Sequence, residues 1–153
     1  MKSFKKMGVG FATGGLVGGF GLNAEFNLMP ADALFVGLGR GDAYNSFSLG
    51  WKHNFESEYL SFYTKVGYGK WFNNGAEAGS ANSNDILRRV LTDSEIADNK
   101  FSTNFVAGGL GLEYNQLEGN LSGVNFYGEI MVLADLRKSM LLPTGSVGIT
   151  YFY

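Results

Sequence analysis

Residues 16–28 read LVGGFGLNAEFNL, and their side chains alternate in character with a period of two. The even positions are mostly large and apolar, as at Leu16, Phe20, Leu22 and Leu28, whereas the odd positions are mainly glycine, asparagine and glutamate. An α-helix repeats about every 3.6 residues, so this alternation predicts a β-strand with one apolar face and one small or polar face.

The same alternation recurs along most of the chain. The predicted strands occupy residues 7–12, 16–28, 34–39, 46–55, 60–69, 106–115, 124–137 and 146–153. Most are longer than an average globular strand of about 5–6 residues and approach the roughly 9–11 residues of a tilted membrane-spanning strand. The pattern therefore predicts an all-β fold, an eight-stranded antiparallel up-and-down transmembrane β-barrel, with residues 1–153 as its single domain.

The composition suits a strand-rich fold and excludes several classes of protein. The 153 residues include 23 glycines, 13 phenylalanines, 8 tyrosines and 2 tryptophans, with 2 prolines, one histidine and no cysteine. Disulfide scaffolds and thiolate metal sites are therefore excluded, and we expect neither a metal nor a cofactor. The net charge of −2 gives no basic footprint, so nucleic acid is not an expected partner.

The run from Met7 to Ala24 is uncharged and 18 residues long, which reaches the minimum length of a membrane-spanning helix. It follows Lys2, Lys5 and Lys6, as the apolar part of a signal peptide follows its basic region. Seven of its residues are glycines, however, and each glycine disfavours a helix by about 1 kcal/mol relative to alanine. We therefore expect strands here, and we expect this chain to lack a signal peptide.

The two faces of the predicted strands distinguish a membrane barrel from a soluble one. Eight strands close around one narrow interior, so only one face can lie inside. Small and charged residues fit that interior and large apolar residues fit lipid, which is the reverse of a soluble barrel. Aromatic residues near one set of strand ends suit an interfacial girdle, namely Trp51, Phe55, Tyr114, Tyr151 and Tyr153.

The links between the predicted strands indicate the orientation of the barrel. The links after the second, fourth and sixth strands are short and centre on residues 30–32, 56–58 and 118–120. Those after the third, fifth and seventh strands include residues 40–45, 73–100 and 138–143, of which only 73–100 is long. Outer-membrane barrels have short periplasmic turns and longer external loops, so we expect both termini in the periplasm and residues 73–100 outside.

The C-terminal octapeptide Ser146–Tyr153 reads SVGITYFY, with Gly148 at its third position and Tyr151 and Tyr153 at its sixth and eighth. This order resembles the C-terminal signal of bacterial outer-membrane barrels that the β-barrel assembly machinery reads. In overall plan the chain resembles the small eight-stranded OmpA/OmpX class. The resemblance implies the bacterial outer membrane as location, with lipid, lipopolysaccharide and the assembly machinery as partners.

The predicted interior face carries charged residues that must find partners there. They are Glu25, Lys52, Lys65, Glu113 and Glu129, with Asp135 and Arg137 nearer the external end. We expect a salt-bridge network in which Tyr63 and Tyr127 take part. Because an interior of eight strands is just wide enough to be filled by side chains, we favour a rigid plug. A narrow ion or small-solute channel is the alternative.

His53 is the only histidine and the one candidate for catalysis, because some small barrels modify lipid A with a histidine, a serine and an acidic residue. Its neighbours Glu56 and Ser57 have the required chemistry. However, its position predicts a lipid-facing side chain at the periplasmic end, far from the Asp93–Ser94 pair in the long loop. We therefore expect no enzyme, and a lipid A-modifying activity is the second alternative.

The predicted external loops carry the candidate interaction residues. Arg40, Gly41 and Asp42 resemble an integrin-binding tripeptide, although Gly-Asp is also common turn chemistry. In the 73–100 loop, apolar residues at helical spacing predict an amphipathic helix, which also carries Arg88 and Arg89. This helix could pack over the barrel mouth, contact lipopolysaccharide or dock another envelope protein. We expect a structural, surface-interaction or accessory-subunit role.

Overall fold

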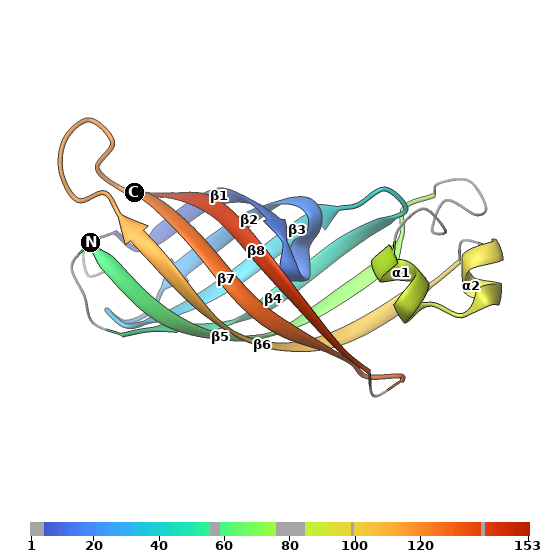
Figure 1. The fold of residues 1–153 in the computed structure, drawn as a ribbon. Helices are drawn as coiled ribbons and strands as arrows, with labels where there is room; N and C mark the ends of the chain where they lie inside the picture. Colours follow the sequence, from blue (N-terminus) through green and yellow to red (C-terminus); the bar gives the residue numbers. More distant parts are fainter. Residues whose placement is uncertain (1–4, 56–58, 76–84, 99, 139) are drawn as a thin grey trace.

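The computed structural model describes residues 5–55, 59–75, 85–98, 100–138 and 140–153 (Figure 1). Within them, eight antiparallel strands form a closed barrel in chain order, with β1 hydrogen-bonded to both β2 and β8. The predicted fold is therefore confirmed. The strands are β1 (Met7–Gly14), β2 (Gly18–Asn27), β3 (Asp32–Arg40), β4 (Tyr44–Asn54), β5 (Leu60–Asn73), β6 (Ser102–Asn115), β7 (Val124–Asp135) and β8 (Leu141–Phe152).

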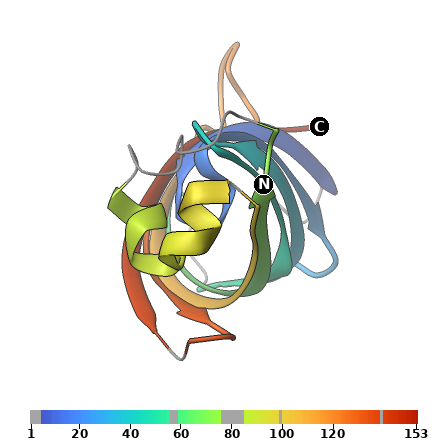
Figure 2. The same cartoon turned by 90° about the vertical axis from the view of Figure 1, so that its right-hand side faces the viewer.

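The two ends of the barrel differ. Both chain ends lie at one of them, here called the terminal end (Figure 1). The other, the loop end, carries the short helices α1 (Asp85–Val90) and α2 (Asp93–Asp98), which lie across the barrel opening (Figure 2). No helix in the described part of the chain is both long and apolar enough to cross a membrane.

The alternating faces lie as the sequence predicts. On β3, Ala33 and Phe35 are buried inside the barrel, whereas Leu34, Val36 and Leu38 are exposed on its outer surface. The same outward exposure of large apolar residues holds around the whole barrel and reaches 71% at Ile130. The outer surface is thus a continuous apolar belt, of a kind that soluble monomers rarely expose to water.

The prediction of a strand from residue 16 is wrong. β1 ends at Gly14, and residues Gly15–Val17 form a single 3₁₀ turn, η1, before β2 starts. Leu16 and Val17 are only 3% and 7% exposed, so they are buried rather than on the lipid-facing side. The turn is possible because Gly15 and Gly18 have φ of 58° and 82°, which residues with a side chain rarely adopt.

Two hydrogen bonds hold η1 inside the barrel, and inward-facing glycines leave room for it. The indole Nε1 of Trp71 donates to the carbonyl oxygen of Leu16 at 2.9 Å, and Ser46 Oγ donates to that of Val17 at 2.6 Å. A Cβ added at Gly69 would come within 2.5 Å of Leu16 Cδ2, and one at Gly37 within 3.0 Å of Val17 Cγ1. The inward-facing glycines therefore leave the space that η1 fills.

The interior divides into two halves of different chemistry. The terminal half holds charged and amide side chains, as predicted for the whole interior. The loop half holds an apolar cluster, so the expectation of a uniformly small and polar interior is wrong there. The cluster consists of Leu16, Phe35, Ala43, Tyr44, Trp71, Leu87, Val90, Leu91, Phe101, Phe105, Ala107, Met131, Leu133 and Leu142.

The links differ from the predicted ones in extent. β6 and β8 begin earlier than predicted, so Pro143 lies in a strand rather than in a loop. The link at 116–123 is longer than the one at 41–43. Loop length therefore distinguishes the two ends of the barrel only because the segment between β5 and β6 is long. The predicted turn at 56–58 lies outside the described residues.

Two glycine substitutions test this packing. A Cβ at Gly50 would collide with the backbone oxygen of Val66 and lie 2.6 Å from Phe35 Cε1, whereas a Cβ at Gly108 would meet nothing within 4 Å. Gly50→Ala should lower the free energy of unfolding by about 1–3 kcal/mol. Gly108→Ala should change it by no more than about 0.5 kcal/mol. Urea unfolding in one lipid system measures both, and equal losses would contradict the assignment of faces.

Candidate functional site

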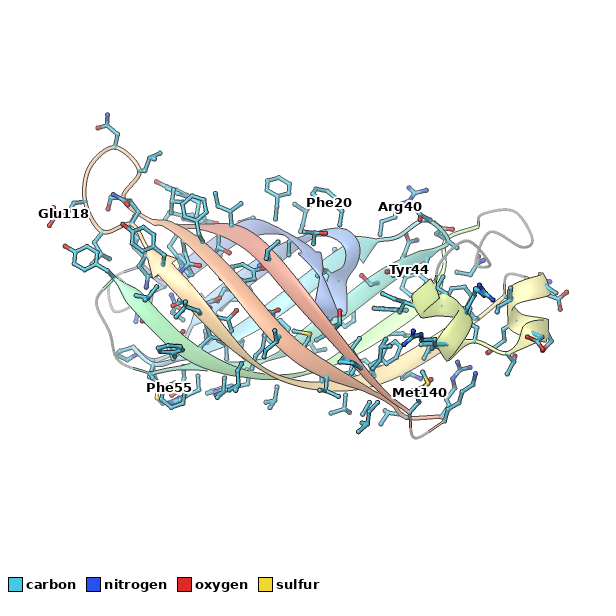
Figure 3. All side chains as sticks on the ribbon, in the orientation of Figure 1. Phe20, Arg40, Tyr44, Phe55, Glu118 and Met140 are labelled. Carbon is cyan, nitrogen blue, oxygen red and sulfur yellow. The ribbon has the colours of Figure 1, made fainter. Side chains whose placement is uncertain are left out.

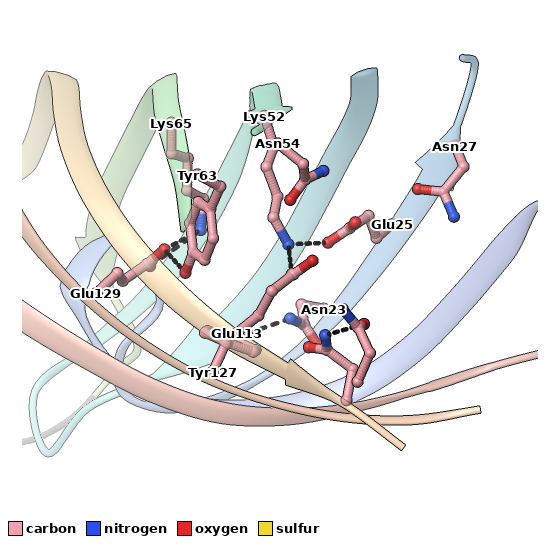
Figure 4. A network of polar contacts seen from close by, with 12 residues as sticks. Asn23, Glu25, Asn27, Lys52, Asn54, Tyr63, Lys65, Glu113, Tyr127 and Glu129 are labelled. Atoms are coloured by element: carbon pink, nitrogen blue, oxygen red, sulfur yellow. Dashed lines mark hydrogen bonds and ion pairs between the residues drawn. The ribbon is translucent and has the colours of Figure 1, made fainter. Parts of the chain in front are cut away.

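Lys52 is the centre of a buried ion-pair group in the terminal half of the barrel (Figure 4). Its Nζ lies 3.0 Å from Glu25 Oε2 and 2.6 Å from Glu113 Oε2. The side chains of all three residues are at most 7% exposed. The three residues come from β2, β4 and β6, so the group ties together strands on different sides of the barrel.

A second group surrounds Glu129 on β7. Its carboxylate accepts a hydrogen bond from Tyr63 OH at 2.8 Å and lies 3.0 Å from Lys65 Nζ. The ammonium of Lys52 lies 4.3 Å from the centroid of the Tyr63 ring, close enough for a cation–π interaction that joins the two groups. Nearby, Asn23 Nδ2 donates to Tyr127 OH at 2.9 Å.

The structure thus brings together Glu25, Lys52, Lys65, Glu113 and Glu129, with Tyr63 beside them. Between this network and η1 remains a cavity of about 20 Å³, room for one water molecule. A closed set of ion pairs in so small a space can brace the strands against each other. Conduction would require these side chains to move apart.

Asp135 and Arg137 do not join the network, although the sequence placed them on the same interior face. They lie at the loop end, where Arg137 Nη1 is 2.6 Å from Glu95 Oε1 of α2 and Nη2 donates to Thr103 Oγ1 at 2.6 Å. The backbone N–H of Arg137 also donates to Asp135 Oδ1 at 2.7 Å. Arg137 therefore fastens α2 to the barrel rim.

The described helical part of the long loop, α1, packs over its own barrel mouth, which is one of the arrangements left open by the sequence. Leu87, Val90 and Leu91 are at most 5% exposed and belong to the apolar cluster. Beneath them, the Trp71 ring stacks on Tyr44 at 4.7 Å and meets Phe105 edge-on at 4.9 Å. α1 is therefore the upper layer of the barrel core.

Trp71 and Phe105 are buried interior residues that no predicted strand included. Both follow the inward alternation of their strands but lie outside the predicted limits, which stopped at residue 69 and started at residue 106. Extending the period of two by one step in each direction would have found them.

Charged side chains remain exposed at the loop end. Arg88 and Arg89 are exposed on α1, and Arg40 and Asp42 are exposed at the β3–β4 turn. The turn itself is fixed, because the backbone N–H of Gly41 donates to the carbonyl oxygen of Tyr44 at 2.8 Å. The candidate interaction residues therefore stand on ordered elements around the closed mouth.

His53 faces outward at the terminal end. Its Nδ1 lies 2.8 Å from Asp32 Oδ1, which also accepts a hydrogen bond from Trp51 Nε1 at 2.9 Å. The neighbours that suggested catalysis, Glu56 and Ser57, lie outside the described residues. Among the residues that are described, no group of three or more side chains is arranged to hold a metal ion.

The chain matches no family model and no curated protein sequence. Its structure is similar to the N-terminal β-barrel domain of Pseudomonas aeruginosa OprF, with a TM-score of 0.64 over 96% of this chain and 98% of that one, at 13% identity. The fold is that of the small outer-membrane barrels.

A second similar protein is Ail, the attachment invasion locus protein of Yersinia pestis. Its structure in a phospholipid bilayer nanodisc matches with a TM-score of 0.52 at 13% identity, covering 97% of this chain and 99% of that one. Its complex with the heparin analogue sucrose octasulfate matches with a TM-score of 0.55 at 14% identity, covering 97% of each chain. At these identities the likeness shows the shared fold.

The ion-pair network predicts a large stability loss when its central cation is removed. Lys52→Met leaves two buried carboxylates facing each other, which should lower the free energy of unfolding by about 3–5 kcal/mol. Adding Glu113→Gln should restore part of this loss, because one of those charges is then gone. Urea unfolding of both variants, with the exposed Lys138→Met as control, measures the effect. Equal losses for Lys52→Met and Lys138→Met would contradict the network.

The contact between α2 and the rim predicts a pH dependence. Partial burial opposes ionisation of Glu95, but hydrogen bonds from the Thr92 backbone and from Arg137 outweigh it, so the pKa of Glu95 lies below its ordinary value of 4.5. The contact therefore stabilises α2 fully above about pH 4.5 and loses this effect as the pH falls through the lowered pKa.

Amide hydrogen exchange of α2 measures this dependence. When the pH is lowered below about 4.5, the protection of the α2 amides against exchange should decrease. The decrease should correspond to no more than about 1 kcal/mol, because the Glu95–Arg137 pair is partly exposed. Glu95→Gln should remove the dependence, whereas Asp98→Asn should retain it. A dependence that survives in Glu95→Gln would show that another group is responsible.

Proposed function

We propose that this chain is a non-enzymatic integral barrel of a bacterial outer membrane, which closes its own lumen and presents its loop end for interactions outside the cell. One observation carries the proposal: the barrel has an apolar outer belt and an interior that is filled by side chains. Phe62, Leu110 and Ile130 are 59–71% exposed on this belt. Lipid solvates such a surface, whereas water does not.

The closed lumen supports a structural rather than a conducting role. The Lys52 and Glu129 groups fill the terminal half, η1 fills the middle, and α1 covers the loop end. A channel would require displacement of all three layers. We therefore favour a structural role for the charges in the lumen, in which they brace the barrel. Measured conduction would contradict this role.

The two unlike ends support an orientation of the barrel in the membrane. The long link and both helices lie opposite the chain ends, and longer loops face outward in outer-membrane barrels. Both termini would then be periplasmic. Gly148 in β8 faces the Tyr127 ring, while Tyr151 in β8 and the following Tyr153 are exposed, so the tyrosines are available to the assembly machinery as a C-terminal signal.

The exposed residues of the loop end support a binding role. Arg88 and Arg89 on α1 and Arg40 at the β3–β4 turn offer guanidinium groups to acidic partners. The complex of Ail with a heparin analogue shows that a barrel of this fold can hold a polyanion. Lipopolysaccharide and the acidic surface of another envelope protein are the partners we propose for this end.

The membrane proposal predicts a heat-modifiable barrel without conductance. The protein should refold only with detergent or lipid, and it should migrate differently on SDS gels before and after boiling. Refolded protein in planar bilayers should give no stable conductance steps, because the interior is filled by side chains. Refolding into a soluble form without detergent would contradict the membrane proposal, and steady conductance steps would replace the plug by a channel.

The proposed binding role of the loop end predicts a partner that depends on Arg88 and Arg89. Pull-down from envelope extracts with the intact protein and with Arg88→Gln/Arg89→Gln should show a partner that the variant retains poorly, with Lys138→Gln as the charge control.

Mass spectrometry of lipid A from cells with and without the protein should show identical species. A modified species that depends on the protein would overturn the non-enzymatic proposal.

A further inference from the structure

Phe20 and Arg40 lie side by side on the outer surface at the loop end. They are direct partners in the pairing of β2 with β3, and both side chains are exposed (Figure 3). The Cβ atoms of directly opposite residues are only about 4.5–5.5 Å apart, so an aromatic ring and a guanidinium stand next to each other. Phe11 stacks on Phe20 at 5.8 Å and supports the ring from the other side.

A hollow of about 590 Å³ opens beside this pair. It is lined by Gly19, Phe20, Arg40, Gly41, Asp42 and Tyr44. Its size lies within the roughly 300–1,000 Å³ of ordinary small-ligand sites. Gly19 and Gly41 keep the floor bare, because a Cβ at Gly41 would collide with the Tyr44 ring.

The floor of the hollow is held in place before any ligand arrives. The Tyr44 ring is buried and stacked on Trp71, so it is part of the apolar cluster of the barrel. Asn74 Nδ2 lies 3.3 Å from the carbonyl oxygens of both Gly41 and Asp42 and holds the turn from the β5 side. A site of fixed shape loses little entropy when it binds.

The two charged side chains of the hollow, Arg40 and Asp42, are exposed. Neither Arg40 nor Asp42 forms an ion pair within the described part of the chain. Phe20 stacks on Phe11 on one side and remains 57% exposed. An exposed arginine, carboxylate and aromatic ring around a glycine floor are therefore free to contact a ligand.

We propose that this hollow binds a pyranose ring that carries one anionic substituent. The guanidinium of Arg40 can hold a carboxylate, sulfate or phosphate with two parallel hydrogen bonds. The Phe20 ring can cover the apolar C–H face of the sugar, and the Asp42 carboxylate can accept hydrogen bonds from its hydroxyl groups. Because Asp42 repels a second acidic group, the site favours a sugar with one acidic group beside free hydroxyls.

The inference rests on the proposed function, since it assumes that the loop end faces outward. Acidic sugars reach that end from two sources. One is the phosphorylated or acidic sugar of lipopolysaccharide in the same membrane, and the other is a free glycan outside the cell. The chemistry that Phe20, Arg40 and Asp42 recognise is the same in both cases.

An NMR titration tests the site. The intact protein, refolded in a detergent without sugar or phosphate such as lauryldimethylamine oxide, is titrated with methyl glucuronide and, separately, with neutral methyl glucoside. Signals of Gly19 and Gly41 should shift with the acidic sugar. The neutral sugar should bind about tenfold or more weakly, because it lacks the charge-assisted contact with Arg40.

Three variants separate the site from general surface charge. Arg40→Gln should weaken binding about tenfold, and Arg40→Lys less, because lysine keeps the charge but loses the paired hydrogen bonds. Phe20→Leu should weaken binding of both sugars alike, since it removes the stacking surface. Lys138→Gln, which removes an exposed cation of the same end, should leave binding unchanged. If Arg40→Gln and Lys138→Gln weaken binding equally, the site is disproved.

A membrane arm identifies the source of the sugar. The protein is placed in phosphatidylcholine vesicles with and without lipopolysaccharide, and methyl glucuronide is added to each. If lipopolysaccharide shifts the Gly19 and Gly41 signals and blocks the added sugar, the ligand is the lipid headgroup. If the added sugar still binds, the ligand is a free glycan. If neither compound shifts these signals while the protein remains heat-modifiable, the inference fails and the proposed function stands.

Discussion

The pairing of β1 with β8 is the constraint on which the rest of the structure depends. Once these strands join, every strand has two neighbours, and no sheet edge remains to be satisfied by water or by another chain. Closure with eight strands also fixes a narrow interior. Each inward side chain must then find room and a partner among the few that face it.

The interior is filled in two chemically different ways. Near the chain ends, long charged side chains reach across the interior and neutralise each other, as Lys52 does between Glu25 and Glu113. Toward the other end, the backbone itself enters at η1, and the aromatic rings of Trp71 and Phe105 fill the remaining space. Helix α1 then completes the packing, so the surface of the loop end rests directly on the barrel interior.

Much of this was readable from the sequence, because a period of two survives wherever a strand is regular. The alternation located all eight strands and put Lys52, Lys65 and Glu129 on the inner face. It failed where the backbone leaves the strand geometry without breaking the pattern. Leu16 continues the even-numbered apolar series of β2, yet it enters the barrel, because the φ angles of Gly15 and Gly18 are not visible as a change in hydrophobicity. The contact of Arg137 with Glu95 could not be predicted either, since it joins segments with no shared periodicity.

The two tryptophans have consequences for how assembly of this protein can be followed. Trp51 lies on the outer belt with its indole N–H held by Asp32, whereas Trp71 is enclosed in the apolar cluster and holds η1. Their fluorescence therefore reports different events. A lipid-borne quencher reaches Trp51 as the strands enter a bilayer, and the emission of Trp71 shifts to shorter wavelength only when the lumen has closed around it. Single-tryptophan variants would thus time membrane insertion and interior packing separately, without any added label.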